Sequence, residues 1–175
     1  MNNNSIIFTN VARFVALVLI QILILKQVVI AEGFWNSFRF ILYPLFILLL
    51  PFNINRLLLI FLGFLVGLSV DIFYDTPGLH ASASTLTAFA RGRVLKILEP
   101  KGGYNVNFSP TRNRMGNSWF VPYVSILLLI HLLFYFTMEA FSVVYIIQIL
   151  QNTILSFIAS FSIIMIFQII FNPLN

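Results

Sequence analysis

The chain has 175 residues, of which 60% are hydrophobic and only 9% are charged, and its mean hydropathy is +0.99. Because about a quarter of the residues in a typical soluble domain are charged, a water-soluble fold is excluded, and so is a disordered chain. The net charge is +5, and the absence of cysteine excludes disulfides, thiol catalysis and cysteine-based metal sites. Long apolar runs disfavour a β-barrel. We expect an all-α polytopic membrane protein, one integral domain over 1–175 with about six transmembrane helices.

The first two predicted spans are 11–30 and 34–50. The first has an apolar stretch of about 20 residues, which is too long for the core of a signal peptide, although Ala31 loosely resembles a cleavage position. We therefore expect a retained helix whose Lys26 extends towards the lipid headgroups. In the second span, Pro44 is expected to kink the helix.

The third predicted span, 57–74, contains a close-packing motif and two acids. Gly63-x-x-x-Gly67 allows a second helix backbone to approach closely. Asp71 and Asp75 lie four residues apart and would share one face of a helix. They could bind a cation or relay protons, or they could simply end the helix at the wet interface. We favour the second role for Asp75, whereas for Asp71 a structural bond to a neighbouring helix stays open beside the functional role.

The fourth predicted span, 79–98, is the least hydrophobic and the richest in small residues. Such a helix packs well against protein, so we expect it inside the bundle or in a protein interface. His80 lies at its start, where we expect a surface or capping role, and its serines lack the partners of a catalytic nucleophile. The alternative is a surface helix, which would leave five spans and an external C-terminus.

A polar loop over about 99–118 precedes the last two predicted spans, 119–138 and 141–171. His131 lies in the middle of the fifth span, and Glu139 follows two turns later. This pair could transfer a proton, but a single hydrogen bond between helices is the simpler interpretation. The sixth span is longer than a bilayer requires, which predicts a tilt or a start along the membrane surface.

The basic residues predict the orientation of the chain. With six spans and a cytoplasmic N-terminus, only Lys26 and Arg39 lie outside, as expected from the positive-inside rule. Both termini and the 99–118 loop would then be cytoplasmic. The eight inner bases are Arg13, Arg56, Arg91, Arg93, Lys96, Lys101, Arg112 and Arg114. No aromatic residues suited to base stacking are interleaved with them, so we expect no nucleic-acid binding. Arg91, Arg93 and Arg112 are candidates for contact with anionic lipid or a cytoplasmic partner.

The sequence offers no constellation for chemistry. No convergent acid, base and nucleophile indicates an enzyme, no loop for phosphate is present, and two distant histidines make a weak metal site. A transporter would need helix breaks within the membrane or buried charge, and neither is evident. We therefore expect no enzymatic activity, no metal and no cofactor, and a role in packing or assembly.

One part of the chain carries a family resemblance. The glycine-rich third span ends at an aspartate, a short acidic turn follows, and Gly-x-His-Ala then opens a small-residue helix that ends in arginine. These positions are Gly63, Gly67, Asp71, Asp75, Gly78, His80, Ala81, Ala88 and Arg91. The pattern resembles the MreD family of rod shape-determining proteins, in the form found in Bacteroidetes. Further matches are Glu99-Pro100, Gly103-Tyr104, Gly116, Trp119, His131 and Glu139. The resemblance is specific between about 57 and 104, and Gly92 departs from it by replacing a bulkier residue.

The resemblance implies a multi-pass protein of the bacterial inner membrane that serves as a scaffold for cell elongation and peripheral peptidoglycan synthesis. Its implied partners are MreC, the polymerase RodA with its transpeptidase, MreB filaments and membrane lipids. Its implied fold is similar to the S components of energy-coupling factor transporters, with a pocket open to one face. The alternative is a vitamin-type substrate-binding subunit of a transporter. The residues expected to hold the fold or meet a partner are Gly63, Gly67, Asp71, Asp75, Gly78, His80, Ala81, Ser84, Ala88, Arg91, Arg93, His131 and Glu139.

Overall fold

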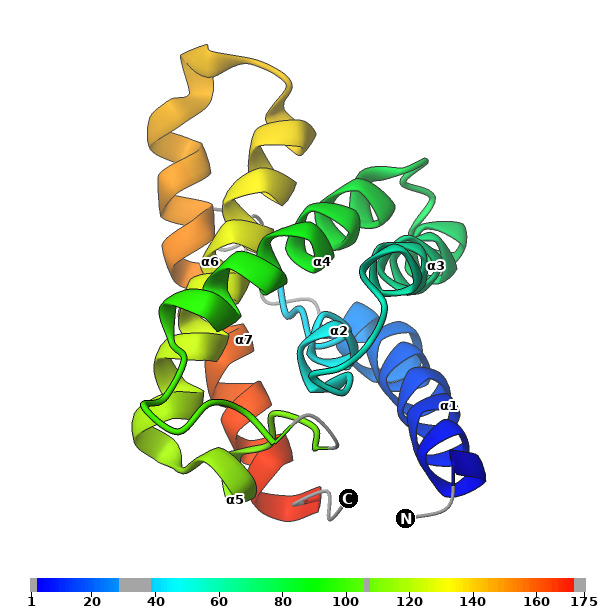
Figure 1. The fold of residues 1–175 in the computed structure, drawn as a ribbon. Helices are drawn as coiled ribbons and strands as arrows, with labels where there is room; N and C mark the ends of the chain where they lie inside the picture. The colour runs from blue at the N-terminus through cyan, green and yellow to red at the C-terminus, as the bar shows by residue number, and fades with distance from the viewer. Residues whose placement is uncertain (1–2, 29–38, 106–107, 172–175) are drawn as a thin grey trace.

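The computed structural model describes residues 3–28, 39–105 and 108–171, and within these ranges the regular structure is helical, with no strand. Figure 1 shows the arrangement of the helices. The chain forms α1 (Asn3–Leu19), a π-helical turn η1 (Ile20–Ile24), a 3₁₀ turn η2 (Leu25–Gln27), α2 (Leu45–Leu49), α3 (Arg56–Tyr74), α4 (Leu79–Ile97), α5 (Arg112–Met115), α6 (Asn117–Ala140), a 3₁₀ turn η4 (Val143–Tyr145) and α7 (Ile146–Phe171).

Four helical stretches of the described chain are long and apolar enough to cross a membrane. They are Ile7–Gln27, α3, α6 and α7. The prediction of an all-helical membrane protein is therefore supported, whereas the count of six spans is not confirmed. The helix α4 is as long as α3, with 19 residues, but its serines, threonines and bases leave it outside this apolar set.

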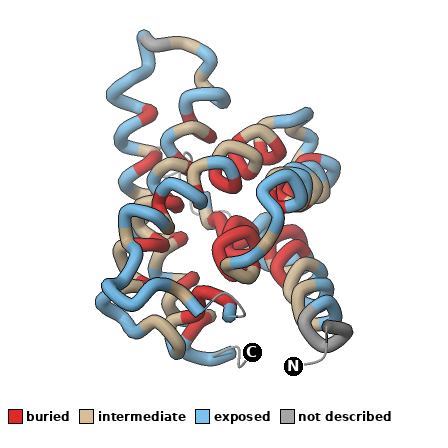
Figure 2. The backbone as a smooth tube through the Cα atoms, in the orientation of Figure 1, coloured by how far each residue is buried: buried red, intermediate tan, exposed pale blue. Residues whose placement is uncertain are grey.

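The predicted second span is not a continuous helix. Residues 39–42 have no regular secondary structure, a turn follows, and α2 has only five residues. Pro44 is the N-cap of α2, so it starts a short helix instead of kinking a long one. Every residue from 41 to 50 is buried, and α2 forms part of the buried centre in Figure 2. Residues 34–38 of the predicted span lie outside the described ranges.

The helix α4 lies at the centre of the fold, where it packs against both α3 and α6 (Figure 1). Its small residues make this possible, because Ala83 and Ala88 are buried without taking up much space between helices. Two connections set the neighbours of α4. A tight turn links it to α3, and the segment from 98 to 116, which includes α5, links it to α6.

The last two helices form an antiparallel hairpin (Figure 1). Phe141 adopts a left-handed conformation with φ 46° and ends α6, and η4 leads directly into α7. The predicted fifth and sixth spans are therefore both present, with α6 starting earlier and α7 starting later than expected. In Figure 1 the first turn of α1, the last turn of α7 and α5 all lie at the lower end of the molecule.

Candidate functional site

The helices α3 and α4 approach each other closely along one seam. A Cβ atom placed on Gly67 would lie 2.4 Å from the carbonyl oxygen of His80 and 2.5 Å from the Cα of Ala81. A Cβ atom on Gly63 would lie 2.9 Å from the Cβ of Ala88. The backbones can meet only because both positions are glycine, so the close approach predicted from the Gly-x-x-x-Gly spacing is confirmed.

Asp71 joins the end of α3 to the start of α4. Its Oδ1 accepts hydrogen bonds from the backbone N–H of His80 at 2.9 Å and from the hydroxyl of Thr76 at 2.8 Å, and its Oδ2 accepts from the N–H of Ala81 at 2.9 Å. The N-cap of α4 is Gly78, which has no side chain to cap the helix. The carboxylate therefore caps α4 from the preceding helix and also meets the positive end of its dipole.

Asp75 does not share this arrangement. It is the C-cap of α3, with φ 55°, and its N–H donates to the carbonyl of Asp71. Its side chain is exposed. This geometry agrees with the helix-ending role favoured for Asp75. Gly78 follows with φ 84°, a conformation that glycine adopts without strain, and so allows α4 to begin at once.

The two histidines meet in the interior through Tyr43. The Tyr43 hydroxyl lies 3.0 Å from His80 Nδ1 and 2.8 Å from His131 Nε2, and His131 Nδ1 lies 2.9 Å from the hydroxyl of Thr87. These four side chains are at most 1% exposed. The expected surface role of His80 is therefore wrong, because α4 turns this side chain inwards. His131 makes bonds between helices, as the simpler interpretation had it.

The proton positions in this network follow from one bond. Thr87 donates its only hydroxyl proton to the carbonyl of Ala83, so its oxygen accepts from His131 Nδ1. His131 Nε2 then accepts from the Tyr43 hydroxyl, whose oxygen accepts from His80 Nδ1. Among the described residues, His80 Nε2 has no partner. The network thus connects α4, α6 and the segment before α2 by neutral hydrogen bonds.

The non-helical segment before α2 obtains its hydrogen bonds from side chains of distant helices. Gln21 Oε1 accepts from the N–H of Leu42 at 2.8 Å, and Gln21 Nε2 donates to the carbonyl of Phe40 at 2.9 Å. Gln21 lies in the π-helical turn η1, a rare geometry that often occurs at sites with a special role. Its second amide proton goes to the hydroxyl of Tyr74, so the whole amide group is used.

Two serines of α7 accept further backbone hydrogen bonds from the same segment. The N–H of Arg39 donates to Ser156 Oγ at 3.0 Å, and the N–H of Ile41 donates to Ser160 Oγ at 2.9 Å. Irregular backbone is tolerated at membrane depth only where protein satisfies its polar groups. Gln21 and the two serines provide this function, and sequence reasoning missed it. The available signal was a Gln and a pair of Ser four residues apart within strongly apolar helices, together with a mid-span proline elsewhere in the chain.

Arg91 lies in the interior, where it is 1% exposed. Its Nε donates to the Tyr123 hydroxyl at 2.9 Å, and its guanidinium donates to the carbonyls of Leu50 and Pro51. The expected contact of Arg91 with lipid or a cytoplasmic partner is therefore wrong. Instead, its positive charge meets the carbonyl end of α2. From the sequence we expected neither a helix break within the membrane nor a buried charge. The broken second span and the buried guanidinium of Arg91 show that this expectation is wrong.

An aromatic cluster fixes the end of α4 at the start of the predicted loop. The indole N–H of Trp119 donates to the carbonyl of Leu98 at 2.7 Å, and the Tyr104 hydroxyl donates to the carbonyl of Leu95 at 2.8 Å. Phe52 stacks on Tyr104 with the ring centroids 4.4 Å apart. Burial raises the pKa of Tyr104, so the hydroxyl keeps the proton that this bond needs.

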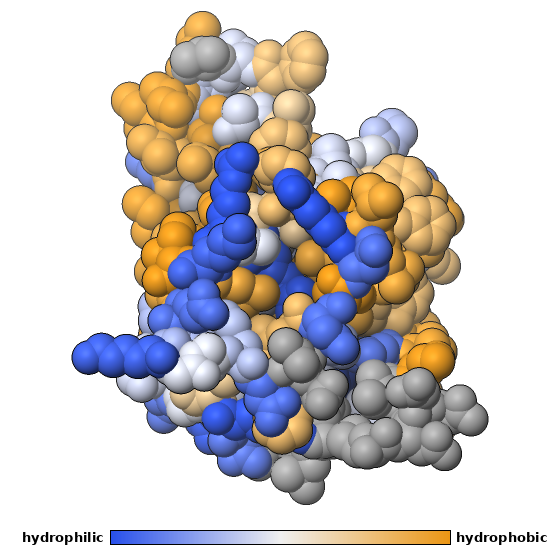
Figure 3. Space-filling model, viewed as in Figure 1, coloured by the Kyte–Doolittle hydropathy of each residue, from blue (hydrophilic) through white to orange (hydrophobic). Residues whose placement is uncertain are grey.

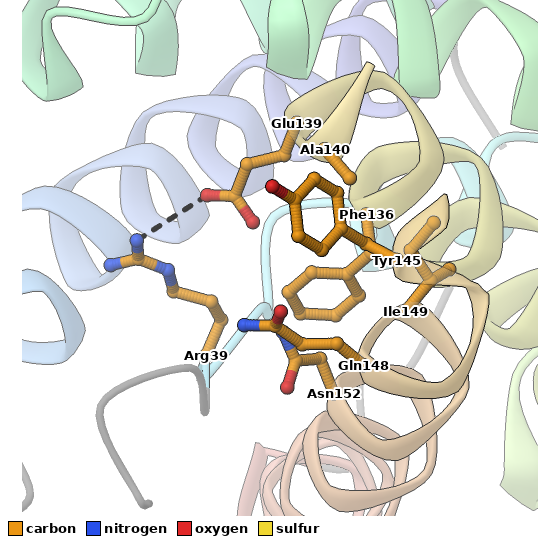
Figure 4. A pocket seen from close by; sticks show the side chains of 8 residues that line it. All are labelled: Arg39, Phe136, Glu139, Ala140, Tyr145, Gln148, Ile149 and Asn152. Atoms are coloured by element: carbon orange, nitrogen blue, oxygen red, sulfur yellow. Dashed lines mark hydrogen bonds and ion pairs between the residues drawn. The ribbon is translucent and has the colours of Figure 1, made fainter. Parts of the chain in front are cut away.

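Glu139 lines a cavity at the opposite end of α6, shown in Figure 4. It forms an ion pair with Arg39 at 3.4 Å, and Tyr135 donates to it at 3.5 Å. The cavity has a volume of about 330 Å³, and Gln148 and Asn152 of α7 contribute further polar groups. Glu139 therefore pairs with Arg39 and not with His131, so the proton-transfer pair expected as an alternative does not form.

The other two predicted arginines lie in the C-terminal half of α4 and in α5. Arg93 is exposed, and its guanidinium lies 5.2 Å from the centre of the Phe89 ring. Arg112 belongs to α5, outside this contact. Within the described ranges, no three histidine or carboxylate side chains come together as metal ligands would. Comparisons with protein-family models, curated proteins and solved structures give no match to the chain.

Proposed function

We propose that the chain is a non-enzymatic scaffold of the bacterial cell-elongation complex, a member of the MreD family that binds MreC in the inner membrane. In this role it helps to control peripheral peptidoglycan synthesis through RodA and its transpeptidase, near MreB filaments. The proposal rests on the family resemblance of the stretch from Gly63 to Arg91, together with the geometry of that stretch.

The observation that carries a scaffold role is the use of the buried polar groups. Asp71, Arg91 and His131 are the ionisable side chains that an enzyme or proton carrier would employ. Each is instead hydrogen-bonded to groups of this chain. Asp71 and Arg91 hold the ends of helices in place, and His131 joins α6 to the side chains of Thr87 and Tyr43. A body braced in this way presents fixed helix surfaces to a partner.

The apolar helix surfaces of α1 and α7 suit a partner that is itself a membrane helix. In Ile7–Gln27, which includes most of α1, and in α7, only 22% of the 18-residue apolar segment is buried within the protein, against 50% in α6. A single-helix partner such as MreC would add to this packing without inserting polar groups into lipid.

Replacement of Asp71 tests the proposal. Asp71→Ala removes the cap of α4 and leaves the N–H groups of His80 and Ala81 without a partner, so the seam loosens. We expect MreC co-purification to fall at least about fivefold, which corresponds to about 1 kcal/mol, and rod-shaped cells to become round. The measurement is affinity purification of tagged MreC from cells that carry the variant as the only copy.

Asp75→Asn is the matched control, because Asp75 is exposed, ends the same helix, and has a left-handed conformation that Asn tolerates. We expect it to behave as the wild type. The proposal fails if Asp71→Ala accumulates at lower levels while the remaining protein still retains MreC in normal proportion and cell shape is unchanged.

A second candidate function is favoured by the cavity beside Glu139. A polar cavity next to a broken membrane segment is typical of transporter subunits that bind a small solute. Arg39, Glu139, Gln148 and Asn152 would supply the contacts. Depletion of the protein separates the two functions. Loss of rod shape or of osmotic integrity supports the scaffold, whereas a vitamin requirement with normal shape supports the transporter subunit.

A further inference from the structure

A second cavity lies between the start of α3 and the C-terminal half of α4. Its volume is about 410 Å³. The residues around it are unusual in their charge, because four of them are bases and none is an acid. These bases are Arg56, Arg91, Arg93 and Lys96. In Figure 3, hydrophilic side chains reach in from both sides of a hollow in the middle of this face, and hydrophobic surface flanks them.

Among the described residues, no acid forms an ion pair with the bases of this cavity. The ion pair recorded for the described residues joins Arg39 to Glu139, and it lies elsewhere. Arg91 directs its guanidinium into the protein, towards the carbonyls of Leu50 and Pro51. Arg56, Arg93 and Lys96 are exposed and remain available to a ligand. Like charges that are brought together without a counterion favour an anion between them.

Phe89 holds two of these cations at the cavity. The guanidinium carbon of Arg56 lies 4.8 Å from the centre of the Phe89 ring, and that of Arg93 lies 5.2 Å from it. Stacking on one ring reduces the freedom of both side chains while their N–H groups stay free. Arginine forks that are ordered in this way match the geometry of phosphate oxygens.

Apolar surface that suits a lipid tail lies on α3 outside the lining of the cavity. Leu57, Phe61, Phe64 and Leu68 are exposed at helical spacing along α3, starting at the residue after Arg56, and Leu57 is 79% exposed. We infer that this cavity binds the phosphate group of an anionic phospholipid, with the acyl chains along this apolar surface. Positive residues at a membrane surface attract anionic lipids of the cytoplasmic leaflet, and here a shaped cavity would select one lipid molecule.

Gly92 keeps the cavity open. It lines the cavity, and nothing lies within 4 Å of the Cβ atom that a larger residue would have there. Glycine inside a helix lowers helix stability by about 0.5–1 kcal/mol relative to alanine, and no packing contact requires it at this position. Space for a ligand explains the residue, and it also provides a steric test that leaves every charge in place.

The test uses the purified full chain in detergent, titrated with phosphatidylglycerol or phosphatidylethanolamine and measured by native mass spectrometry. The double variant Arg56→Gln/Arg93→Gln removes the ordered forks. Gly92→Leu fills the cavity without changing the charge. Lys101→Glu is the matched control, because it changes the net charge by the same two units at an exposed position of the neighbouring loop. A melting curve of each variant reports whether it is folded.

We expect the apparent Kd for phosphatidylglycerol to rise at least about tenfold in both cavity variants, through lost charge-assisted hydrogen bonds or lost space. The loop control should bind as the wild type does, and phosphatidylethanolamine should bind weakly throughout. An equal loss in the loop control would mean diffuse surface charge and would overturn the inference. Competition by inorganic phosphate at the concentration of the lipid would identify a small-anion site instead.

Unchanged lipid binding in the folded cavity variants would also overturn the inference. If these variants keep lipid but lose a co-purifying acidic protein, the cavity is a protein docking site. The measurement uses the chain alone, so its failure is distinct from a failure of the proposed MreC scaffold.

Discussion

At the scale of single residues, buried polar side chains of this protein act on backbone groups of other elements. Asp71 binds N–H groups at the start of α4, and Arg91 binds carbonyls at the end of α2. Gln21 donates to the carbonyl of Phe40 and accepts from the N–H of Leu42. In the membrane, where water does not replace a missing partner, each of these bonds matters more than its equivalent on a soluble surface.

Arg91 provides the residue-scale prediction. Arg91→Met keeps an unbranched apolar stem but removes the guanidinium, which leaves the carbonyls of Leu50 and Pro51 and the Tyr123 hydroxyl without their donor. We expect the free energy of unfolding to fall by about 2–3 kcal/mol, measured by denaturant titration in detergent. Lys101→Met, an exposed position in the following loop, should change it by less than about 0.5 kcal/mol. An equal stability of both variants would mean that water satisfies the carbonyls.

At the scale of elements, α4 is the helix around which the others are arranged. Its small face meets α3 at Gly63 and Gly67, while Thr87 faces α6 through His131. The same composition that makes α4 too polar for lipid lets it lie between two apolar helices.

Glycine-to-alanine substitutions should affect stability in opposite directions at the tightly packed seam between α3 and α4 and at the open side of α4. Gly67→Ala would place a methyl group 2.4 Å from the carbonyl oxygen of His80, so the helices must move apart. We expect a loss of stability of about 1–3 kcal/mol, seen as a lower melting temperature in detergent. Gly92→Ala, in open space on the same pair of helices, should raise stability by up to about 1 kcal/mol. A neutral Gly67→Ala would contradict the backbone contact.

At the scale of the whole molecule, the orientation of α4 in the membrane decides the topology. The six-span prediction places Asp75 outside and Lys101 in the cytoplasm, whereas a surface helix would leave both on one side. Because the chain has no cysteine, single substitutions Asp75→Cys and Lys101→Cys report their side without background. We expect a membrane-impermeant maleimide to label residue 75 from outside intact spheroplasts and residue 101 only after lysis. Labelling of both from the same side would support the five-span alternative.

Much of the helical architecture follows from local features of the chain. Hydropathy alone places α3, α6 and α7 to within a few residues at most ends, because a membrane helix must be apolar over its own length. The Gly63/Gly67 spacing identifies the close seam, and the acidic turn identifies the boundary between α3 and α4. These are properties of neighbouring residues, so the sequence contains them directly.

The tertiary structure decided what the polar residues do. Residues 40–44 are apolar, yet they do not form a helix, and Ser156 and Ser160, more than 100 positions away, accept from the N–H groups of Arg39 and Ile41. Likewise, His80 and Arg91 are typical of a helix surface until Tyr43 and the end of α2 provide partners in the interior. Hydropathy and spacing describe one segment at a time, whereas a buried hydrogen bond depends on which segments meet, and only the folded chain determines that.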